Sequence, residues 1–153
     1  MEIRRAVPEE AVFLAETRIR QLLDEGSTMV YDTRQEMTDF FERKIKSGEY
    51  MQLIGTVDGE FTCTAGLLFQ EYPPSISWKG AKRGYICNVY TRPEYRKKGY
   101  ASILIKELIK EARQRDLGNL WLMASKEGRT LYKTLGFDDI REGHDVYMEW
   151  YEE

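Results

Sequence analysis

One succession of segments restricts the possible folds of this chain more than any other. An apolar run at residues 85–90 is followed by a short basic turn, and the turn opens an amphipathic helix. Apolar side chains recur on one face of that helix, at Ala101, Leu104, Ile105, Leu108 and Ala112. A second apolar run, residues 120–124, follows the helix and has the composition of a strand buried on both faces. The succession predicts a β-α-β unit with parallel strands and a right-handed crossover.

The turn between the first strand and the helix has the chemistry of an anion site. The first backbone N–H groups of a helix have no internal acceptor and lie at the positive end of the helix dipole, so a bound phosphate is stabilised by both. Gly99 has no side chain and lets phosphate oxygens reach the backbone. Arg92 adds positive charge, which only Glu94 opposes locally. We predict that the phosphate contacts come from Arg96, Lys97, Lys98, Gly99, Tyr100, Ala101 and Ser102.

The whole chain predicts the element order β-αα-βββ-α-β-α-ββ. The predicted strands are residues 3–6, 51–57, 60–69, 81–91, 120–124, 137–140 and 146–151. The predicted helices begin at Pro8, Thr33, Ala101 and Ser125 and end near Gly26, Gly48, Arg115 and Leu135. Thr33 and Glu36 match a capping box, and Asp58-Gly59 predicts a two-residue hairpin turn. Two prolines predict an irregular loop at residues 70–80, which we expect beside the site.

Composition limits the class of protein. The chain has 153 residues, 42% of them hydrophobic and 32% charged, so we expect one soluble domain over residues 1–153. The formal net charge of -3 predicts no binding to nucleic acid or to an anionic membrane surface. Two cysteines, no apolar run of about 18 residues and no signal-like N-terminus predict a cytoplasmic location. The single histidine, His144, leaves little material for a metal site, and we predict none.

Two sequence motifs, one in the turn and one near the C-terminus, narrow the class of protein further. The turn reads R-x-x-G-x-A at residues 96–101, which matches neither the Walker loop nor the dinucleotide-binding fingerprint. The second motif, at residues 124–137, places Leu131-Tyr132 on a short helix that is followed by Gly136-Phe137. Together, and in this order of elements, the two motifs resemble those of the GNAT superfamily of N-acyltransferases.

The resemblance implies a fold and a reaction. The GNAT fold is an α/β (α+β) arrangement, with a central mixed, mostly antiparallel sheet of about seven strands flanked by about four helices. A splayed pair of parallel strands forms its CoA site. The resemblance further implies acetyl-CoA as co-substrate and a small-molecule or peptide amine as acceptor. Transfer would then be direct, in a ternary complex of protein, acetyl-CoA and amine.

The resemblance also implies residue roles. Unpaired backbone groups of Val89, Tyr90 and Thr91 would bind pantetheine like an added strand, and an N–H at the Val89 end would stabilise the tetrahedral oxyanion. Tyr132 is the expected general acid, which protonates the departing CoA thiolate. Ser125 stands where many members carry an asparagine that contacts the cofactor. This shorter side chain either keeps that contact or serves as a helix N-cap.

The sequence leaves the general base and the acceptor site more open. Where some GNAT members carry a glutamate, this chain has Tyr85 and Cys87. Glu71, His144 or a water molecule remain as alternatives for the base. We expect Cys87 to be a packed strand residue rather than an acyl-accepting nucleophile, because no histidine is near it in the sequence. The candidates for binding the acceptor are Arg18, Arg20, Glu71 and Asn88.

The same patterns support two other functions less well. They also predict an assembly state. The main alternative is a non-catalytic acyl-CoA-binding or regulatory protein on the GNAT fold, against which the intact turn and Tyr132 both argue. A nucleic-acid binder fits poorly, because the basic cluster is compact and the net charge is negative. The apolar strand predicted at residues 146–151 would be an exposed sheet edge, so we expect a homodimer.

Overall fold

A computed structural model describes residues 1–74, 76, 81–139 and 150 of the chain. The chain divides into two compact units, Met1–Met123 and Ala124–Glu153. The first unit holds a sheet with three α-helices, and the described part of the second holds one short helix. A single domain over residues 1–153 therefore stays a prediction.

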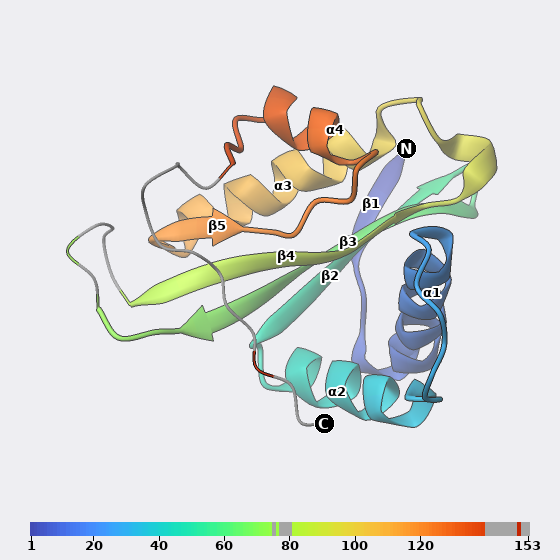
Figure 1. The fold of residues 1–153 in the computed structure, drawn as a ribbon, viewed down its shortest axis with the longest axis horizontal. Helices are drawn as coiled ribbons and strands as arrows, with labels where there is room; N and C mark the ends of the chain where they lie inside the picture. Colours follow the sequence, from blue (N-terminus) through green and yellow to red (C-terminus); the bar gives the residue numbers. More distant parts are fainter. Residues whose placement is uncertain (75, 77–80, 140–149, 151–153) are drawn as a thin grey trace. The chain divides into compact units, whose positions relative to one another are not determined.

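The sheet of the first unit is mixed and mostly antiparallel, as predicted. Its strands follow chain order across the sheet, and only the last pair is parallel (Figure 1). The strands are β1 (Glu2–Arg5), β2 (Tyr50–Val57), β3 (Glu60–Glu71), β4 (Lys82–Thr91) and β5 (Asn119–Trp121). Asp58 and Gly59 join β2 to β3 with φ values of 51° and 79°, the left-handed pair that a tight hairpin turn requires. The predicted hairpin is therefore confirmed.

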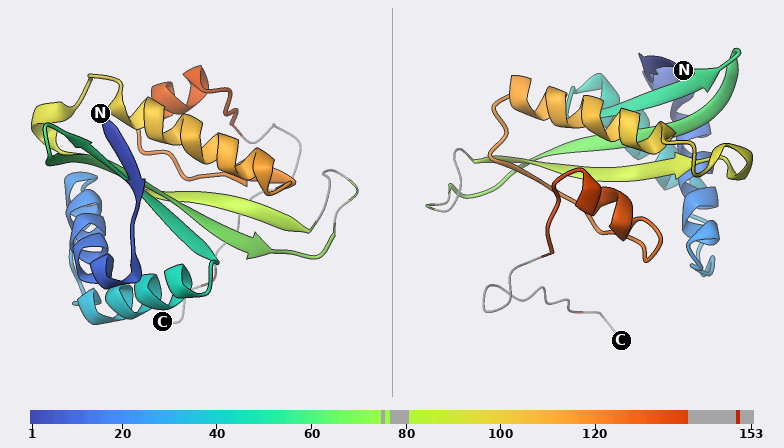
Figure 2. Two further views of the ribbon diagram at one scale, coloured as in Figure 1. Left: turned by 180° about the vertical axis from the view of Figure 1, so that it is seen from behind. Right: turned by 90° about the horizontal axis from the view of Figure 1, so that it is seen from above.

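Helices cover both faces of the sheet. α1 (Ala11–Asp24) and α2 (Arg34–Lys46) lie on one side of it, and α3 (Tyr100–Gln114) lies on the other (Figures 1 and 2). Short 3-10 helices, η1 (Pro8–Glu10) and η2 (Pro93–Tyr95), precede α1 and α3. The core between α1, α2 and the sheet includes the buried residues Leu14, Ala15, Phe41, Tyr50 and Ile54. The predicted helical face of α3 is buried at Leu104, Ile105, Leu108 and Ala112.

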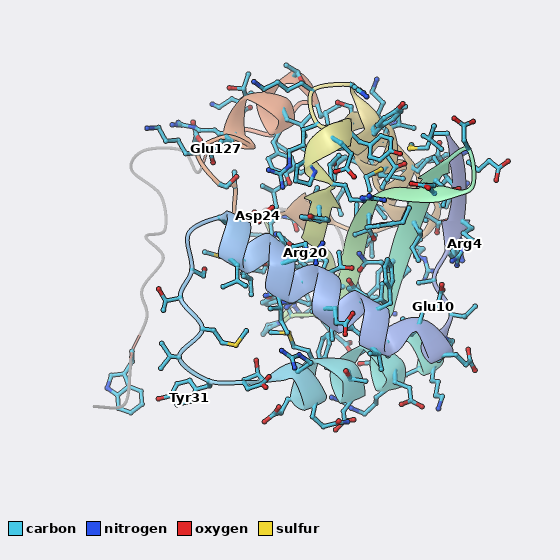
Figure 3. All side chains as sticks on the ribbon, turned by 90° about the vertical axis from the view of Figure 1, so that its right-hand side faces the viewer. Arg4, Glu10, Arg20, Asp24, Tyr31 and Glu127 are labelled. Atoms are coloured by element: carbon cyan, nitrogen blue, oxygen red, sulfur yellow. The ribbon has the colours of Figure 1, made fainter. Side chains whose placement is uncertain are left out.

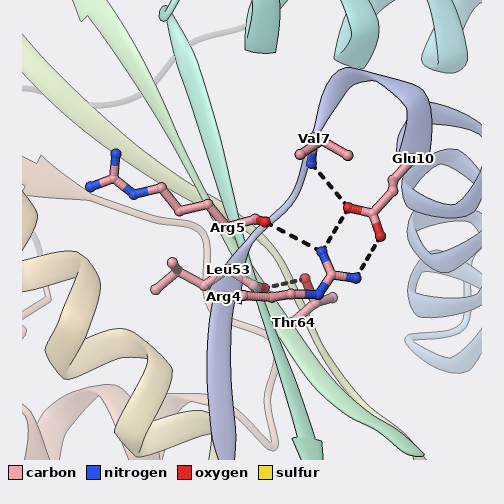
Figure 4. A network of polar contacts seen from close by, with 6 residues as sticks. All are labelled: Arg4, Arg5, Val7, Glu10, Leu53 and Thr64. Atoms are coloured by element: carbon pink, nitrogen blue, oxygen red, sulfur yellow. Dashed lines mark hydrogen bonds and ion pairs between the residues drawn. The ribbon is translucent and has the colours of Figure 1, made fainter. Parts of the chain in front are cut away.

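A polar network fixes the turn between β1 and α1. The Arg4 guanidinium donates to both carboxylate oxygens of Glu10, at 2.9 and 2.6 Å, and the Val7 N–H donates to the same carboxylate at 3.0 Å (Figure 4). The Arg4 side chain lowers the pKa of the Glu10 carboxyl below its usual value, mainly through this hydrogen bond. These contacts therefore link the end of β1 to the start of the helix.

Several predicted details differ in the structure. Strand β5 has three half-buried residues rather than five buried ones, because it pairs with β4 only briefly, and Met123 beyond it is 68% exposed. Strand β3 continues through Glu71, so the irregular segment begins later than predicted. At the start of α2, Asp32 rather than Thr33 accepts the Arg34 N–H, at 3.2 Å, so the predicted capping box is wrong.

The last two predicted strands account for the difference between five strands and about seven. Phe137 to Asp139 are not in a strand, so the first of these predictions is wrong over its described residues. The second, at residues 146–151, lies outside the described residues apart from Trp150, which is not in a strand.

The second unit contains α4 (Arg129–Thr134). The Ser125 hydroxyl accepts the Gly128 N–H at 3.2 Å and the Ser125 carbonyl accepts the Arg129 N–H at 3.0 Å, so Ser125 organises the turn before the helix. Tyr132 is buried in α4, with its ring centroid 5.9 Å from that of Phe137.

Candidate active site

Strand β4 contains a β-bulge at Asn88. Its pairing with β3 passes from Gly66 opposite Cys87 to Thr64 opposite Tyr90, so β4 holds one residue more than β3 over this step. Asn88 has φ 52°, a left-handed conformation that asparagine adopts more readily than most residues. The bulge interrupts the regular ladder immediately before Val89.

Buried polar side chains hold the bulge in place. Gln52 Nε2 donates to the Thr64 hydroxyl at 2.5 Å and to the Asn88 carbonyl at 3.3 Å, and the Tyr50 hydroxyl donates to Gln52 Oε1. The Thr64 hydroxyl donates in turn to the Leu53 carbonyl at 2.6 Å, a bond that is also drawn in Figure 4. Because β3 lies between β2 and β4 in the sheet, the Gln52 side chain must pass over it.

Gly66 provides the room for this crossing. It faces Gln52 in the register of β2 and β3, and a Cβ at Gly66 would lie 2.6 Å from Gln52 Oε1. A side chain at this position would therefore displace Gln52 from the Asn88 carbonyl. A glycine inside a strand is a recognised sign of such a close approach, and it is the one signal that sequence analysis could have used here.

The bond from Gln52 also sets the direction of the next N–H. The described residues contain no cis peptide bond, so the Asn88 carbonyl and the Val89 N–H point in opposite directions across one planar unit. The carbonyl is held from the β2 side of the strand. The Val89 N–H accordingly points away from Gln52.

On the β5 side of β4, no described strand pairs with its edge over most of its length. Strand β5 pairs only with Arg83, Gly84 and Tyr85, and the last pair stacks Tyr85 on Trp121 with ring centroids 4.2 Å apart. Among the described residues, no strand pairs with this edge from Ile86 to Thr91. Such an edge can accept an added, strand-like ligand.

The predicted turn at the N-terminus of α3 has the backbone of an anion site. Lys97 and Gly99 have left-handed φ values of 61° and 82°, a pattern that directs successive N–H groups into one concavity. The Gly99 carbonyl accepts the Ile103 N–H at 3.3 Å as the first bond of the helix. The earlier N–H groups of the helix therefore have no acceptor within it.

The basic side chains around this turn differ in how they are engaged. Arg96 forms an ion pair with Asp24, in the last turn of α1 (Figure 3), and donates to the Thr91 carbonyl at 2.9 Å. Arg92 pairs with Glu94 at 2.5 Å. No ion pair of Lys97 or Lys98 occurs among the described residues, so these two lysines supply the uncompensated charge. Arg96, by contrast, links the turn to α1.

A cavity of about 300 Å³ lies on the α1 and α2 side of the sheet, next to the bulge. Its wall is mostly apolar, with two charged side chains. The lining residues are Arg18, Glu36, Met37, Phe40, Phe41, Leu68, Tyr85, Cys87 and Asn88. Arg18 Nη1 donates to Asn88 Oδ1 at 2.9 Å, so the cavity and the bulge share a residue.

Comparison with known proteins decides what this arrangement is. Residues 17–137 match the model of the acetyltransferase (GNAT) family. The chain belongs to the GNAT acetyltransferase family. The β-bulge, the open edge of β4 and the turn before α3 are thus features of a GNAT chain.

Individual relatives support the assignment over different lengths. A crystal structure of a predicted acetyltransferase with acetyl-CoA, from Clostridium acetobutylicum, has a TM-score of 0.88 and 33% identity over 95% of both chains. The bovine thialysine N-epsilon-acetyltransferase is 31% identical over 97 residues, which are 61% of this chain and 55% of that protein. The chloroplastic GCN5-related N-acetyltransferase 2 of Arabidopsis thaliana is 36% identical over 66 residues, 43% of this chain and 25% of its own length. The matched stretches therefore span between a quarter and about half of these two curated relatives.

The titratable groups beside the cavity of this GNAT chain are held neutral. Burial raises the pKa of Cys87 to about 11 and raises that of Tyr85, and it raises the pKa of Tyr50 well above its usual value. These thiol and phenol groups are therefore protonated at neutral pH. Cys87 is a packed thiol rather than an activated nucleophile, in line with the sequence analysis.

The structure brings some predicted acceptor residues together and separates another. Arg18 and Asn88 meet at the cavity, and Glu36, which sequence analysis missed, lies at its exposed rim. Glu71 pairs with Lys82 at the far end of β4, about 23 Å of extended strand from Val89. Glu71 is thus too far away to take a proton directly from an amine bound beside Val89, and its role as base or acceptor-binding residue stays a prediction.

The remaining predicted site residues belong to the second unit. His144 lies outside the described residues. Ser125 makes the turn contacts of a helix start, and Tyr132 is packed in α4.

In the part of the chain that the structure describes, no three His, Cys, Asp or Glu side chains are grouped as a metal site requires. Nor, over the same residues, is any helix long and apolar enough to cross a membrane.

Proposed function

We propose that this protein is an N-acetyltransferase that moves an acetyl group from acetyl-CoA to a primary amine by direct transfer in a ternary complex. One observation carries the proposal. Among the described residues, no strand pairs with the β4 edge after Tyr85, and this edge runs directly into a turn whose first helical N–H groups have no acceptor within the helix, so a strand-like chain ending in phosphates fits both. Pantetheine and pyrophosphate are joined in that way in CoA.

The cofactor contacts follow from the direction of the strand. Backbone groups of Val89, Tyr90 and Thr91 bind the pantetheine amides, and the N–H groups from Lys97 to Ser102 bind the pyrophosphate. The acetyl-CoA in the Clostridium structure, which is 33% identical to this chain, supports this assignment. Lys97 and Lys98 add charge at the phosphates, while Arg96 positions the turn through Asp24.

The reaction needs one electrophile, one nucleophile and two proton transfers. The amine nitrogen attacks the thioester carbonyl carbon, and the Val89 N–H stabilises the negative oxygen of the tetrahedral intermediate. Collapse of the intermediate breaks the C–S bond and releases the CoA thiolate. Tyr132 is the proposed donor of a proton to that thiolate, on the strength of its sequence motif. A water molecule or His144 is the proposed acceptor of the amine proton, because Glu71 lies too far away to take it directly.

The setting of the reaction is proposed from the sequence. The cysteine usage and the charge of the chain support a cytoplasmic protein without a nucleic-acid partner. The C-terminal apolar segment supports a homodimer.

The test separates an enzyme from an acyl-CoA-binding protein. Purified protein is mixed with acetyl-CoA and a pool of primary amines, and free thiol and acetylated products are measured by a thiol reagent and by mass spectrometry. Thiol release that depends on the amines supports the proposal. Tight binding of acetyl-CoA in calorimetry with no release from any amine would show a binding protein instead.

A further inference from the structure

The cavity beside the bulge has an uneven distribution of charge. Arg18 is half-buried, its one hydrogen bond goes to the Asn88 side chain, and it has no carboxylate partner among the described residues. A guanidinium has five N–H donors, so most of the donors of Arg18 remain available to a ligand. Glu36 is the other charged residue that lines the cavity, and it lies at the exposed rim and forms no ion pair with Arg18.

Three other polar groups of the described residues near Arg18 carry no charge. Tyr50, Tyr85 and Cys87 are neutral at pH 7, because burial raises the pKa of each. The rest of the wall is apolar, with Phe40, Phe41 and Leu68 among its members. A positive charge in such surroundings gains most from an anion that brings its own charge into the cavity.

We infer that the acceptor amine carries a carboxylate, which Arg18 binds, together with an apolar group that packs against the aromatic wall. The inference rests on the proposed function and names the substrate class, an apolar amino acid. The position of Arg18 supports the short spacing of an amino acid, because the guanidinium contacts Asn88, whose neighbour Val89 offers the N–H to the thioester. The carboxylate and the reacting amine are therefore bound close together.

A polycationic acceptor fits the same cavity poorly. A second ammonium group at its inner end would face Arg18 and lose solvation without gaining a partner. A hydrocarbon amine without a carboxylate would fill the apolar wall and leave the guanidinium unpaired. An acceptor that carries an apolar group and a single carboxylate therefore matches the cavity.

The experiment compares acceptors that differ only in the carboxylate. Initial rates are measured with phenylalanine and phenethylamine, and with leucine and isoamylamine. We expect kcat/KM to be about tenfold to a hundredfold higher for each amino acid, the range that a charge-assisted hydrogen bond provides. Equal or faster acetylation of the decarboxylated amines would overturn the inference and leave the proposed function standing. Absence of acetylation with every amine would overturn the proposed function itself.

Variants of Arg18 tell recognition apart from a structural role. Arg18→Met should raise KM for the amino acids at least tenfold while kcat/KM for the decarboxylated amines changes little, and Arg18→Lys should recover part of the loss. Arg113→Met, on the exposed side of α3, is the matched control and should leave both rates unchanged. An equal loss with both acceptor classes in Arg18→Met would show that Arg18 only supports Asn88, and would overturn the inference.

Discussion

At the scale of the residue, Gln52 acts on a strand that is not its neighbour. Its amide holds the Asn88 carbonyl, and the planar peptide then directs the Val89 N–H. Gln52→Leu removes that bond, so the N–H should lose part of its alignment with the thioester oxygen. We expect kcat to fall about tenfold to a hundredfold, less than the 10²–10³-fold that follows complete removal of one oxyanion donor.

Two measurements test whether the fall in kcat of Gln52→Leu results from misalignment of the Val89 N–H. The affinity for acetyl-CoA should stay near normal in Gln52→Leu, because the pyrophosphate turn is unchanged. The infrared carbonyl band of bound, ¹³C-labelled acetyl-CoA should move toward its position in water. Thr62→Val, which removes another buried hydroxyl of the sheet, controls for general destabilisation. An unshifted carbonyl band with a normal kcat in Gln52→Leu would contradict the positioning role.

A second prediction concerns the proton on the leaving thiolate. Tyr132→Phe keeps the ring that packs against Phe137 and removes only the hydroxyl. Loss of a positioned general acid typically lowers the rate about 10²–10⁴-fold, so kcat should fall by that factor with little change in acetyl-CoA affinity. The loss should be smaller for acyl donors whose thiol has a lower pKa.

The outcome for Tyr132→Phe also distinguishes its alternatives. If the variant retains most of its kcat, solvent supplies the proton. If it loses thermal stability and acetyl-CoA affinity together, the hydroxyl is structural, and the proposed acid is a different group.

A third prediction tests whether Cys87 reacts. With a pKa of about 11, only about one thiol in a thousand is ionised at pH 8. The native protein should therefore resist iodoacetamide at pH 8, and both Cys87 and Cys63 should label fully in denaturant, as measured by mass spectrometry. Alkylation of native Cys87 should accelerate only as the pH approaches 11. Rapid labelling at pH 7 with loss of activity would restore the cysteine as a nucleophile.

At the scale of the element, the N-terminus of α3 depends on Gly99. Its φ of 82° strains any side chain there, although a Cβ would meet no neighbouring atom. Gly99→Val should thus combine some loss of stability with a strong loss of CoA affinity, because the side chain occupies the approach of the phosphate. Calorimetric titration with CoA measures the affinity.

A matched variant separates strain from exclusion of the phosphate. Gly48 has a φ of 74° and equally open surroundings after α2, so Gly48→Val carries similar backbone strain away from the turn. We expect similar melting temperatures for the two variants and reduced CoA binding only for Gly99→Val. Equal affinity in both variants would remove the pyrophosphate from this turn.

The elements that the sequence predicted well are those with local patterns. The α3 periodicity, the Asp58-Gly59 turn and the strand before the basic turn depend on neighbouring residues, and each appears in the structure. The bulge does not depend on a local pattern, because it arises from the register of β4 against β3 and from a side chain two strands away. The cavity needs four elements, so the sequence offered Arg18 as a candidate by its charge but gave no reason to place Glu36 beside it.

At the scale of the whole molecule, the predicted homodimer remains to be tested. The apolar segment at residues 146–151 lies outside the described residues apart from Trp150, so the prediction depends on its sequence. Light scattering at high micromolar concentration should give twice the 18.0 kDa mass of the chain. Chains truncated before residue 146 should then scatter as monomers. A monomeric mass for the full chain at that concentration would refute the prediction.

The extra residue in β4 makes the sheet less regular, and the proposed acetyl transfer depends on that irregularity. Deleting Asn88 would restore an even count between β3 and β4 and allow the ladder to run without interruption. The shortened strand would pair Val89 with Ala65 in a regular ladder, so Val89 would no longer lie in a bulge, while Tyr90 would stay opposite Thr64. A laboratory selection for heat resistance alone could therefore favour this deletion. The deletion would move the Val89 N–H away from the position proposed for the oxyanion. Screens for stabilised variants of this protein therefore need an activity step at every round.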